Sequence, residues 1–294
     1  MPSNPVTPPA EATAPASGAP RERVVVDADG VSLHTWTWDA DAPRAVVHIV
    51  HGVGEHARRY DHVAVRLVAS GFTVVADDHR AHGATGAGHE GVGNLGRGTV
   101  RAALEGVGRV DRAIKADLPD TPLVLLGHSW GSFIAQTLVA RSSAHYDGLV
   151  LSGSSLALPG LTRRAAYNAA WDGPEASGRE WLSRDPEVGR AFADDPWCFD
   201  VGDEPPFSLR ESLAISGAPP RRLDHDLPVL VHGGSEDPIG GERGQRLLAA
   251  AYERWTRLSD VTCLVYPGAR HEIYNETNRE QVLDDLVAWL DVRF

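Results

Sequence analysis

Residues 123–132 read LVLLGHSWGS, which is an apolar run, then the pattern Gly-x-Ser-x-Gly, then the beginning of a helical pattern. This order predicts a buried strand that turns sharply into a helix at Ser129. A serine hydroxyl at its ordinary pKa is a poor nucleophile, and such a turn holds it where a base can reach it. Gly127 and Gly131 allow the close backbone approach that the turn requires. Ser129 is therefore a candidate nucleophile, whereas the five-residue pattern by itself would indicate only a glycine-containing turn.

Short apolar runs alternate with helical patterns on both sides of this segment. The later apolar runs are continuous, which is typical of strands covered on both faces, and Asp29-Gly30 marks a hairpin between the first two strands. This alternation predicts an α/β fold with a mostly parallel sheet and helices on both faces. The expected strands are residues 24–26, 31–38, 45–50, 73–76, 123–126, 149–151, 229–231 and 261–265, and the expected helices lie near residues 60–68, 100–118, 133–139, 247–255 and 282–290.

One interval, residues 155–216, interrupts the alternation. It shows no strand pattern, is dense in aromatic residues and is too long for a plain connection. Residues 172–211 hold eleven Asp or Glu against four Arg, a net charge of −7. We interpret the interval as a helical cap inserted over one edge of the sheet, between core segments 22–154 and 217–294. Its aromatic side chains either line an acyl pocket or form a small core for the cap, and the sequence leaves both interpretations open.

Two loops offer partners for Ser129. The chain has thirteen histidines, and catalytic groups in open α/β sheets collect on loops at the carboxyl ends of strands. His271 follows the last expected strand and is the candidate base. Asp237 follows the preceding strand and is the candidate for the acid that orients His271, with Glu236 as its competitor. The chain order Ser, Asp, His is that of the α/β-hydrolase arrangement.

The loop HGVGEH at residues 51–56 follows another expected strand. Attack on a carbonyl creates an oxyanion that needs two preorganised N–H donors. We expect these donors to be the backbone amides of Val53 and Trp130. We also expect His51, His128 and Trp197 to contact the substrate. The same loop is also consistent with a glycine-rich turn before the next helix.

Two other motifs suggest a dinucleotide site and a metal site, but each is weaker than the evidence for a serine nucleophile. The pattern G-x-G-x-x-G occurs at residues 86–91 and 91–96, but a dinucleotide site needs it directly between a strand and a helix. We interpret these residues as a loop near the site entrance. The acids and histidines at residues 77–82 and 51–56 lack the spacing of zinc-binding helix motifs. We therefore expect no metal and no cofactor, and we expect residues 77–83 to shape loops through hydrogen bonds.

Composition restricts the possible partners. The chain has 294 residues with 28 Lys or Arg against 40 Asp or Glu, a net charge of −12. Such a chain is a poor ligand for nucleic acids and for anionic membranes, and no apolar run is long enough to cross a bilayer. Residues 1–21 form a Pro-, Ala- and Ser-rich segment that we expect to be a disordered tail and not a signal peptide. Two cysteines make no disulfide framework, so we expect a cytoplasmic protein, a monomer or weak homodimer.

Six segments resemble the monoacylglycerol lipase and lysophospholipase branch of the α/β hydrolases, which is also described as serine aminopeptidase-like. The resemblance runs from about residue 24 to 292. It implies an eight-stranded sheet, a cap after the sixth strand, and ester hydrolysis without a cofactor. It assigns Ser129 as nucleophile, Asp237 as orienting acid and His271 as base. The segments are HGVGEHARRY (51–60), DDHRAHG (77–83), GHSWGS (127–132), SRDPEVGRAFADDPWCF (183–199), GGSEDP (233–238) and YPGARHEIYNE (266–276).

Two features depart from this family's pattern. Trp130 stands where methionine is more usual, and we expect its indole to narrow the acyl pocket. The cap is acidic, whereas docking at a membrane requires an exposed apolar or basic face. An esterase for small or short-chain esters, or for a monoacyl lipid, therefore fits best. A thioesterase, a prolyl-type aminopeptidase, an acyltransferase and a non-catalytic binding scaffold remain alternatives.

Overall fold

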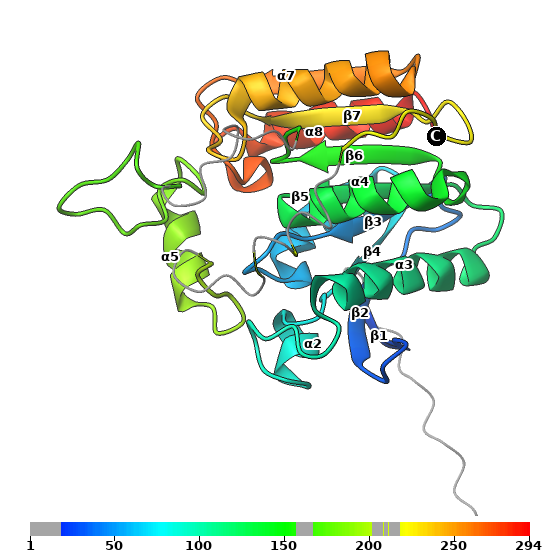
Figure 1. Ribbon diagram of the computed structural model, residues 1–294, viewed down its shortest axis with the longest axis horizontal. Coiled ribbons are helices and arrows are strands. Elements are labelled where there is room, and N and C mark those ends of the chain that lie inside the picture. Colours follow the sequence, from blue (N-terminus) through cyan, green and yellow to red (C-terminus); the bar gives the residue numbers. More distant parts are fainter. Residues whose placement is uncertain (1–18, 157–166, 202–207, 209–210, 212–217) are drawn as a thin grey trace, which may run out of the picture.

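The computed structural model describes residues 19–156, 167–201, 208, 211 and 218–294. Within these residues one sheet of eight strands has the order β1-β2-β4-β3-β5-β6-β7-β8 (Figure 1). Pairs β1–β2 and β2–β4 are antiparallel, and the other five are parallel. The predicted α/β fold and its eight strands are confirmed. The strands are β1 (Arg21–Val26), β2 (Ser32–Trp38), β3 (Ala45–Val50), β4 (Phe72–Asp77), β5 (Leu123–His128), β6 (Gly148–Ser152), β7 (Val229–Gly234) and β8 (Val261–Tyr266).

The first hairpin forms where Asp29-Gly30 predicts it. Gly30 has φ +84°, a conformation that costs glycine little. The Asp27 carboxylate accepts hydrogen bonds from the amides of Asp29 and Val31, at 2.8 and 3.0 Å. This turn sets the register of β1 on β2. β1 begins at Arg21, the last residue assigned to the predicted tail, and residues 1–18 of that tail lie outside the described residues.

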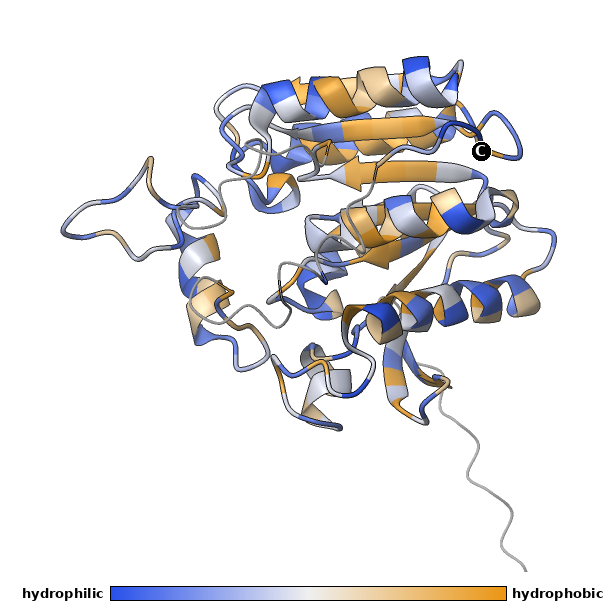
Figure 2. Cartoon of the chain, in the orientation of Figure 1, coloured by the Kyte–Doolittle hydropathy of each residue, from blue (hydrophilic) through white to orange (hydrophobic). Residues whose placement is uncertain are grey.

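Helices cover both faces of the sheet, which explains why the central strands are apolar along their whole length. Every residue of β3, β4, β5 and β7 is buried. One core cluster joins the sheet to α3, α4 and α7, and the other joins it to α1 and α8. Figure 2 shows the apolar strands between helices whose outer sides are hydrophilic. Two layers of helix on a parallel sheet leave the loops at the strand carboxyl ends as the natural place for a site.

The five predicted helices are present, with shifted ends. The helix expected at residues 247–255 begins earlier, at Gly241, and its last turn is a π-helix. The helices are α1 (Asp61–Ala69), α2 (Gly83–Ala87), α3 (Thr99–Asp117), α4 (Trp130–Ser142), α5 (Pro186–Asp194), α7 (Gly241–Ala251) and α8 (Arg279–Asp291), with short turns η1 (Ala57–Tyr60), η2 (Ser143–His145), η3 (Tyr252–Thr256) and η4 (Ile273–Asn275).

The described part of the interval between β6 and β7 contains α5 and no strand. The Asp185 carboxylate caps this helix by accepting the amide of Glu187 at 3.0 Å, and Pro186 occupies its first turn. Figure 1 places α5 beyond the carboxyl ends of the parallel strands. Residues 157–166, 202–207, 209–210 and 212–216 of the predicted cap lie outside the described residues, as does residue 217 of the predicted core. None of the helices that the structure describes is both long enough and apolar enough to span a membrane.

Candidate active site

Ser129 lies at the sharp turn between β5 and α4. Its backbone has φ 52° and ψ −122°, a region that L-residues rarely adopt. The chain here passes so closely over β3 that a Cβ on Gly131 would lie 2.0 Å from the carbonyl oxygen of Val50. A Cβ on Gly127 would lie 2.5 Å from the Gly131 carbonyl oxygen. Positions 127 and 131 therefore require glycine, because neighbouring backbone atoms leave no room for a Cβ. This close packing holds the strained serine at the end of the strand.

His271 and Asp237 form a buried hydrogen-bonded pair. His271 Nδ1 and Asp237 Oδ1 are 2.9 Å apart, and the side chains are 3% and 0% exposed. The same carboxylate oxygen accepts the amide of Ile239 at 2.8 Å. Burial by itself lowers the pKa of His271, but the Asp237 carboxylate, together with Glu272 and Glu55, more than offsets burial, so the pKa lies above its ordinary value. The pair can hold an imidazolium in place.

One pocket collects the predicted residues from three loops. Ser129, His271 and Val53 line it together with His128. A Cβ on Gly153 would lie 2.9 Å from the rings of both His128 and His271. These two rings have centroids 4.7 Å apart, and burial followed by the charge of His271 keeps the pKa of His128 well below its ordinary value. The structure thus places a neutral imidazole beside the candidate base.

The segment around α5 forms the other side of this pocket. The Trp181 ring lies 4.9 Å from the His271 ring, and its carbonyl accepts the His271 amide at 3.2 Å. The Leu182 carbonyl accepts the Glu272 amide at 2.8 Å. The side chains that this segment contributes to the pocket are Tyr167, Arg179, Trp181, Leu182, Phe192, Phe199, Asp200 and Val201. Several of the aromatic residues counted in the sequence therefore line the pocket, and Trp181 also positions the histidine loop.

Three predicted contacts lie elsewhere. His51 is fully buried, stacks on His79 with ring centroids 3.8 Å apart, and supports the loop from below. Trp197 packs edge-on against His56 instead of lining the pocket. The Trp130 indole does not narrow the pocket either, because it stacks on His82 with ring centroids 5.5 Å apart. Only the backbone of Trp130, the first residue of α4, stays next to Ser129.

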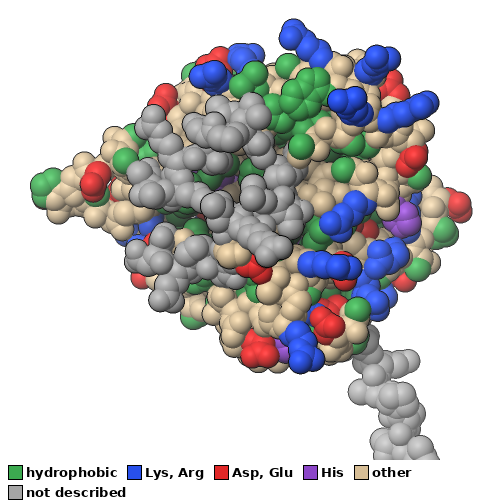
Figure 3. Space-filling view, viewed as in Figure 1, with side chains coloured by type: hydrophobic (Ala, Val, Ile, Leu, Met, Phe, Trp, Pro, Cys, Tyr) green, Lys and Arg blue, Asp and Glu red, His purple; other side chains and the backbone are tan. Residues whose placement is uncertain are grey.

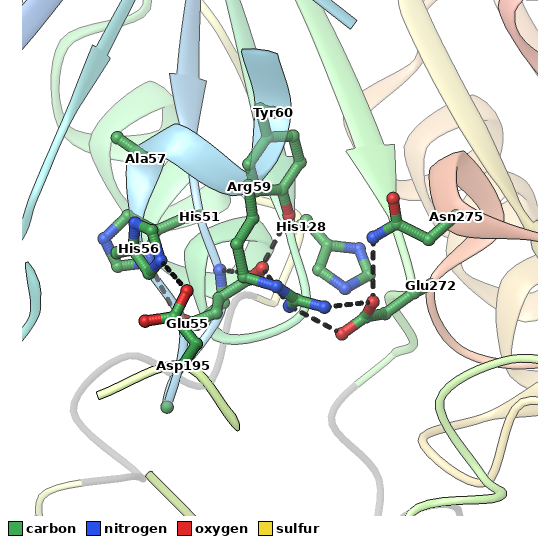
Figure 4. Close-up of polar contacts among 12 residues, drawn as sticks. His51, Glu55, His56, Ala57, Arg59, Tyr60, His128, Asp195, Glu272 and Asn275 are labelled. Atoms are coloured by element: carbon green, nitrogen blue, oxygen red, sulfur yellow. Dashed lines mark hydrogen bonds and ion pairs between the residues drawn. The ribbon is translucent and has the colours of Figure 1, made fainter. Parts of the chain in front are cut away.

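A charged network that the sequence analysis did not predict supports the loop of Val53 (Figure 4). Arg59 bridges two buried carboxylates, at 2.9 Å from Glu55 and 2.8 Å from both oxygens of Glu272. Glu55 in turn accepts the amide of Gly52 at 2.6 Å and the hydroxyl of Tyr60 at 2.8 Å. This network ties the loop before η1 to the residue that follows His271.

The charge balance of the network depends on Arg59. Burial alone would raise the pKa of Glu272, but Arg59 holds it below its ordinary value. Burial raises the pKa of Glu55 in spite of the same guanidinium. The only sequence signal for this arrangement was an acid four residues before an arginine in HGVGEHARR. The partner Glu272 is 213 residues away from Arg59, so no local pattern reports it.

We predict that Arg59→Gln destabilises the protein by about 3–5 kcal/mol, because the substitution leaves two buried carboxylates without their cation. Urea unfolding followed by tryptophan fluorescence measures the change. The matched control is Arg58→Gln, whose partner Asp61 is partly exposed, as is Arg58 itself; its expected cost is about 0–1 kcal/mol. Equal stability of the two variants would contradict a structural role for the network.

The acids and histidines of residues 77–82 form hydrogen bonds that hold neighbouring loops. Asp78 accepts the amides of Ala57 at 2.9 Å and Ala84 at 2.7 Å. Asp77 bonds the rings of His48 and His79 at 2.9 and 2.8 Å. Burial lowers the pKa of His48, yet Asp111 and Asp77 together raise it to about 10. The acids and histidines of residues 77–82 therefore hold the loops beneath the candidate active site in place.

A larger cavity, of about 340 Å³, lies apart from these residues between α3 and α4. Arg109, Arg112 and Arg141 line it, and Figure 3 shows Lys and Arg side chains gathered on this face of the molecule. None of Ser129, Asp237 and His271 contributes to it. The smaller pocket is therefore the candidate active site.

The sheet order, the strained serine between β5 and α4, and the helices on both faces define an α/β hydrolase. A model of the family described as serine aminopeptidase, S33, matches residues 41–278. The monoacylglycerol lipase of Mycolicibacterium smegmatis (strain ATCC 700084 / mc(2)155) is 34% identical over 264 residues, covering 87% of this chain and 90% of that protein. The monoglyceride lipase of Mus musculus is 30% identical over 281 residues, covering 92% and 90%.

A solved structure agrees at the level of the fold. The thermostable carboxyl esterase of Bacillus coagulans, in complex with glycerol, superposes with a TM-score of 0.82 at 24% identity, covering 94% of this chain and 99% of that one. The chain belongs to the serine aminopeptidase S33 family, within the monoacylglycerol lipase-like branch of the α/β hydrolases, and is a hydrolase of ester bonds. The resemblance stated from the sequence motifs is confirmed.

Proposed function

We propose that this chain hydrolyses monoacylglycerols or smaller carboxylic esters through an acyl-enzyme on Ser129. The observation that carries the proposal is the buried bond of 2.9 Å between His271 and Asp237, beside a pocket that Ser129 and His271 both line. The named activities of the bacterial and mouse relatives support an ester of glycerol as the substrate. No cofactor takes part in the proposed reaction.

The mechanism follows from the protonation of His271. Its Nδ1–H donates to Asp237, which fixes the tautomer and leaves Nε2 to take the Ser129 proton during attack on the carbonyl. The backbone amides of Val53 and Trp130 stabilise the oxyanion. His271 then protonates the leaving alcohol, and later activates a water that releases the acid. Asp237 stabilises the imidazolium in both half-reactions.

The same groups also suit other acyl transfers. A thioesterase or an acyltransferase would use them unchanged, and a prolyl-type aminopeptidase would need acids such as those around α5 to hold a substrate ammonium. Comparing p-nitrophenyl butyrate, an acyl-CoA and proline p-nitroanilide separates the hydrolases, and product analysis with added alcohols detects acyl transfer. We expect the highest kcat/KM with the ester. A non-catalytic scaffold would turn over none of these substrates.

A fluorophosphonate probe tests the proposal directly. The wild-type protein should take up one equivalent of probe, on the tryptic peptide that contains Ser129. Mass spectrometry identifies the labelled residue. A wild-type protein that stays unlabelled, or that is labelled at another serine, would refute Ser129 as the nucleophile.

We predict that kcat/KM falls tenfold per pH unit below a midpoint above pH 6.5. His271 acts as a base only when neutral, and its pKa in the free enzyme is raised because Asp237, with Glu272 and Glu55, outweighs the effect of burial. Activity is therefore complete above the raised pKa and is lost as the pH falls through it. Initial rates with p-nitrophenyl butyrate between pH 5 and 9 measure the midpoint. A midpoint below 6.5 would contradict this account of His271.

A further inference from the structure

His56, Asp195 and Cys198 converge at a second place near the pocket, on its outer side. Each offers one ligand atom, and these atoms all lie within 4.8 Å of one another. His56 comes from the loop after β3, whereas Asp195 and Cys198 follow α5. The fold therefore brings His56 to two donor groups that begin 139 residues further along the chain.

The local backbone explains why the two residues after α5 point the same way. The Cys198 amide donates to the Asp195 carbonyl at 3.1 Å, which closes a tight turn. The Trp197 amide donates to Asp195 Oδ1 at 2.9 Å and fixes that carboxylate. Asp195 Oδ2 then bonds His56 Nε2 at 2.8 Å (Figure 4). The carboxylate and thiol are thus presented to the imidazole by a short, hydrogen-bonded segment.

His56 carries a second, unsatisfied nitrogen. Its ring is only 5% exposed, and among the described residues Nδ1 has no hydrogen-bond partner. The two ring nitrogens point in different directions, so a cation beside Asp195 would be bound by Nε2, which already faces that carboxylate. The Trp197 ring, 5.3 Å from the imidazole, holds the ring orientation.

We propose that His56, Asp195 and Cys198 bind a zinc-like divalent cation, with water as the fourth ligand. Imidazole, carboxylate and thiolate together select Zn²⁺ or Co²⁺ over Mg²⁺ and Ca²⁺. Ligands on a tetrahedral zinc lie roughly 3.4–3.8 Å apart. His56 Nε2 and Asp195 Oδ2, which are 2.8 Å apart, would therefore separate slightly, and any pair near the 4.8 Å limit would move closer. Asp195 and Cys198 are only half-buried, and small rotations of their side chains are open to them.

The acidic side chains around Cys198 favour a cation at this place. Asp195, Glu55 and Glu272 lie near enough to Cys198 to act on its thiol, as does the guanidinium of Arg59. Those three acids outnumber the single guanidinium. Metal binding breaks the S–H bond, passes the proton to solvent and forms the sulfur–metal bond, with no change in oxidation state.

The consequence of binding is a crosslink between two sides of the pocket. The Phe199 amide already donates to the Gly54 carbonyl at 2.9 Å, and Phe199 lines the pocket. A cation held by the neighbouring Cys198 and by His56 would fasten this segment to the loop that carries Val53. The site does not depend on the proposed chemistry of Ser129, because none of its ligands belongs to that set.

Cobalt is the sharpest probe of the site. The untagged full-length protein, kept reduced with a phosphine, should bind one equivalent of Co²⁺ with a near-ultraviolet thiolate charge-transfer band, and Zn²⁺ should displace it. Cys198→Ser should abolish the band and weaken Zn²⁺ binding at least about 100-fold, since loss of a ligand exceeds the 10- to 100-fold cost of losing an outer-shell partner. Competition with a chromophoric chelator measures the affinity.

Matched variants keep the test decisive. Cys263→Ser removes the other half-buried cysteine and should leave the band and the Zn²⁺ affinity unchanged. Asp195→Asn keeps both cysteines and should weaken binding while preserving the band at higher cobalt concentration. Zn²⁺ should raise the Tm of the wild type and of Cys263→Ser, and should leave the Tm of Cys198→Ser unchanged. A band that survives in Cys198→Ser, or the absence of saturable binding by the wild type, would overturn the proposal.

Discussion

Ser129→Ala is expected to lower kcat for ester hydrolysis on the order of 10⁶-fold, because the acyl-enzyme has no other oxygen on which to form. The stability of the variant should match that of the wild type. Alanine keeps the Cβ in the strained φ 52° conformation and removes one hydroxyl. Progress curves with p-nitrophenyl butyrate at enzyme concentrations high enough to detect the residual rate measure the loss.

The control for this result is Ser142→Ala, at the exposed last turn of the same helix. It should keep wild-type kcat. A Ser129→Ala protein that retains a tenth of wild-type activity would place the nucleophile elsewhere. If both variants lose activity equally, the cause is damage to α4 and not loss of a reacting group.

Local sequence patterns predicted the sheet because the strands are recognisable from short apolar runs in the sequence. Leu123 to Leu126 are apolar without a break, which reports burial on both faces, and every residue of β5 is buried. The glycines at 127 and 131 likewise reflect contacts made within the turn and with the neighbouring β3. Features of this kind depend on a few adjacent residues or on one sheet position, so periodicity and turn chemistry suffice to predict them.

Side chains that meet through tertiary contacts were predicted less well. Trp197 is as aromatic as Trp181, yet Trp181 lies against His271 while Trp197 packs on His56. Composition cannot tell these two apart, because the choice depends on how the segment around α5 sits on the core. The same limit applies to Trp130, because its indole packs against the buried His82 and not in the pocket.

Asp237→Asn is expected to lower kcat by up to about 10⁴-fold, because an amide that donates its N–H to Nδ1 would select the wrong tautomer of His271. The shape of the side chain is kept, but the amide nitrogen that faces Nδ1 cannot accept from the Ile239 amide, which bonds the same oxygen in the wild type. The pH profile should shift as well. Without the carboxylate, only Glu272 and Glu55 oppose the effect of burial on His271, so its pKa falls and the acid limb moves to lower pH.

Glu236→Gln separates this role from a general effect of charge on the loop. Glu236 is exposed, whereas Asp237 is buried and bonded to His271. Losing the exposed charge should change kcat less than about twofold, since solvent screens it. The combination of a large fall in kcat and a shifted acid limb in Asp237→Asn distinguishes an orienting acid from a residue that only stabilises the turn, which would lower stability and leave the limb in place. A crippled Glu236→Gln beside an active Asp237→Asn would reverse the assignment of the two acids.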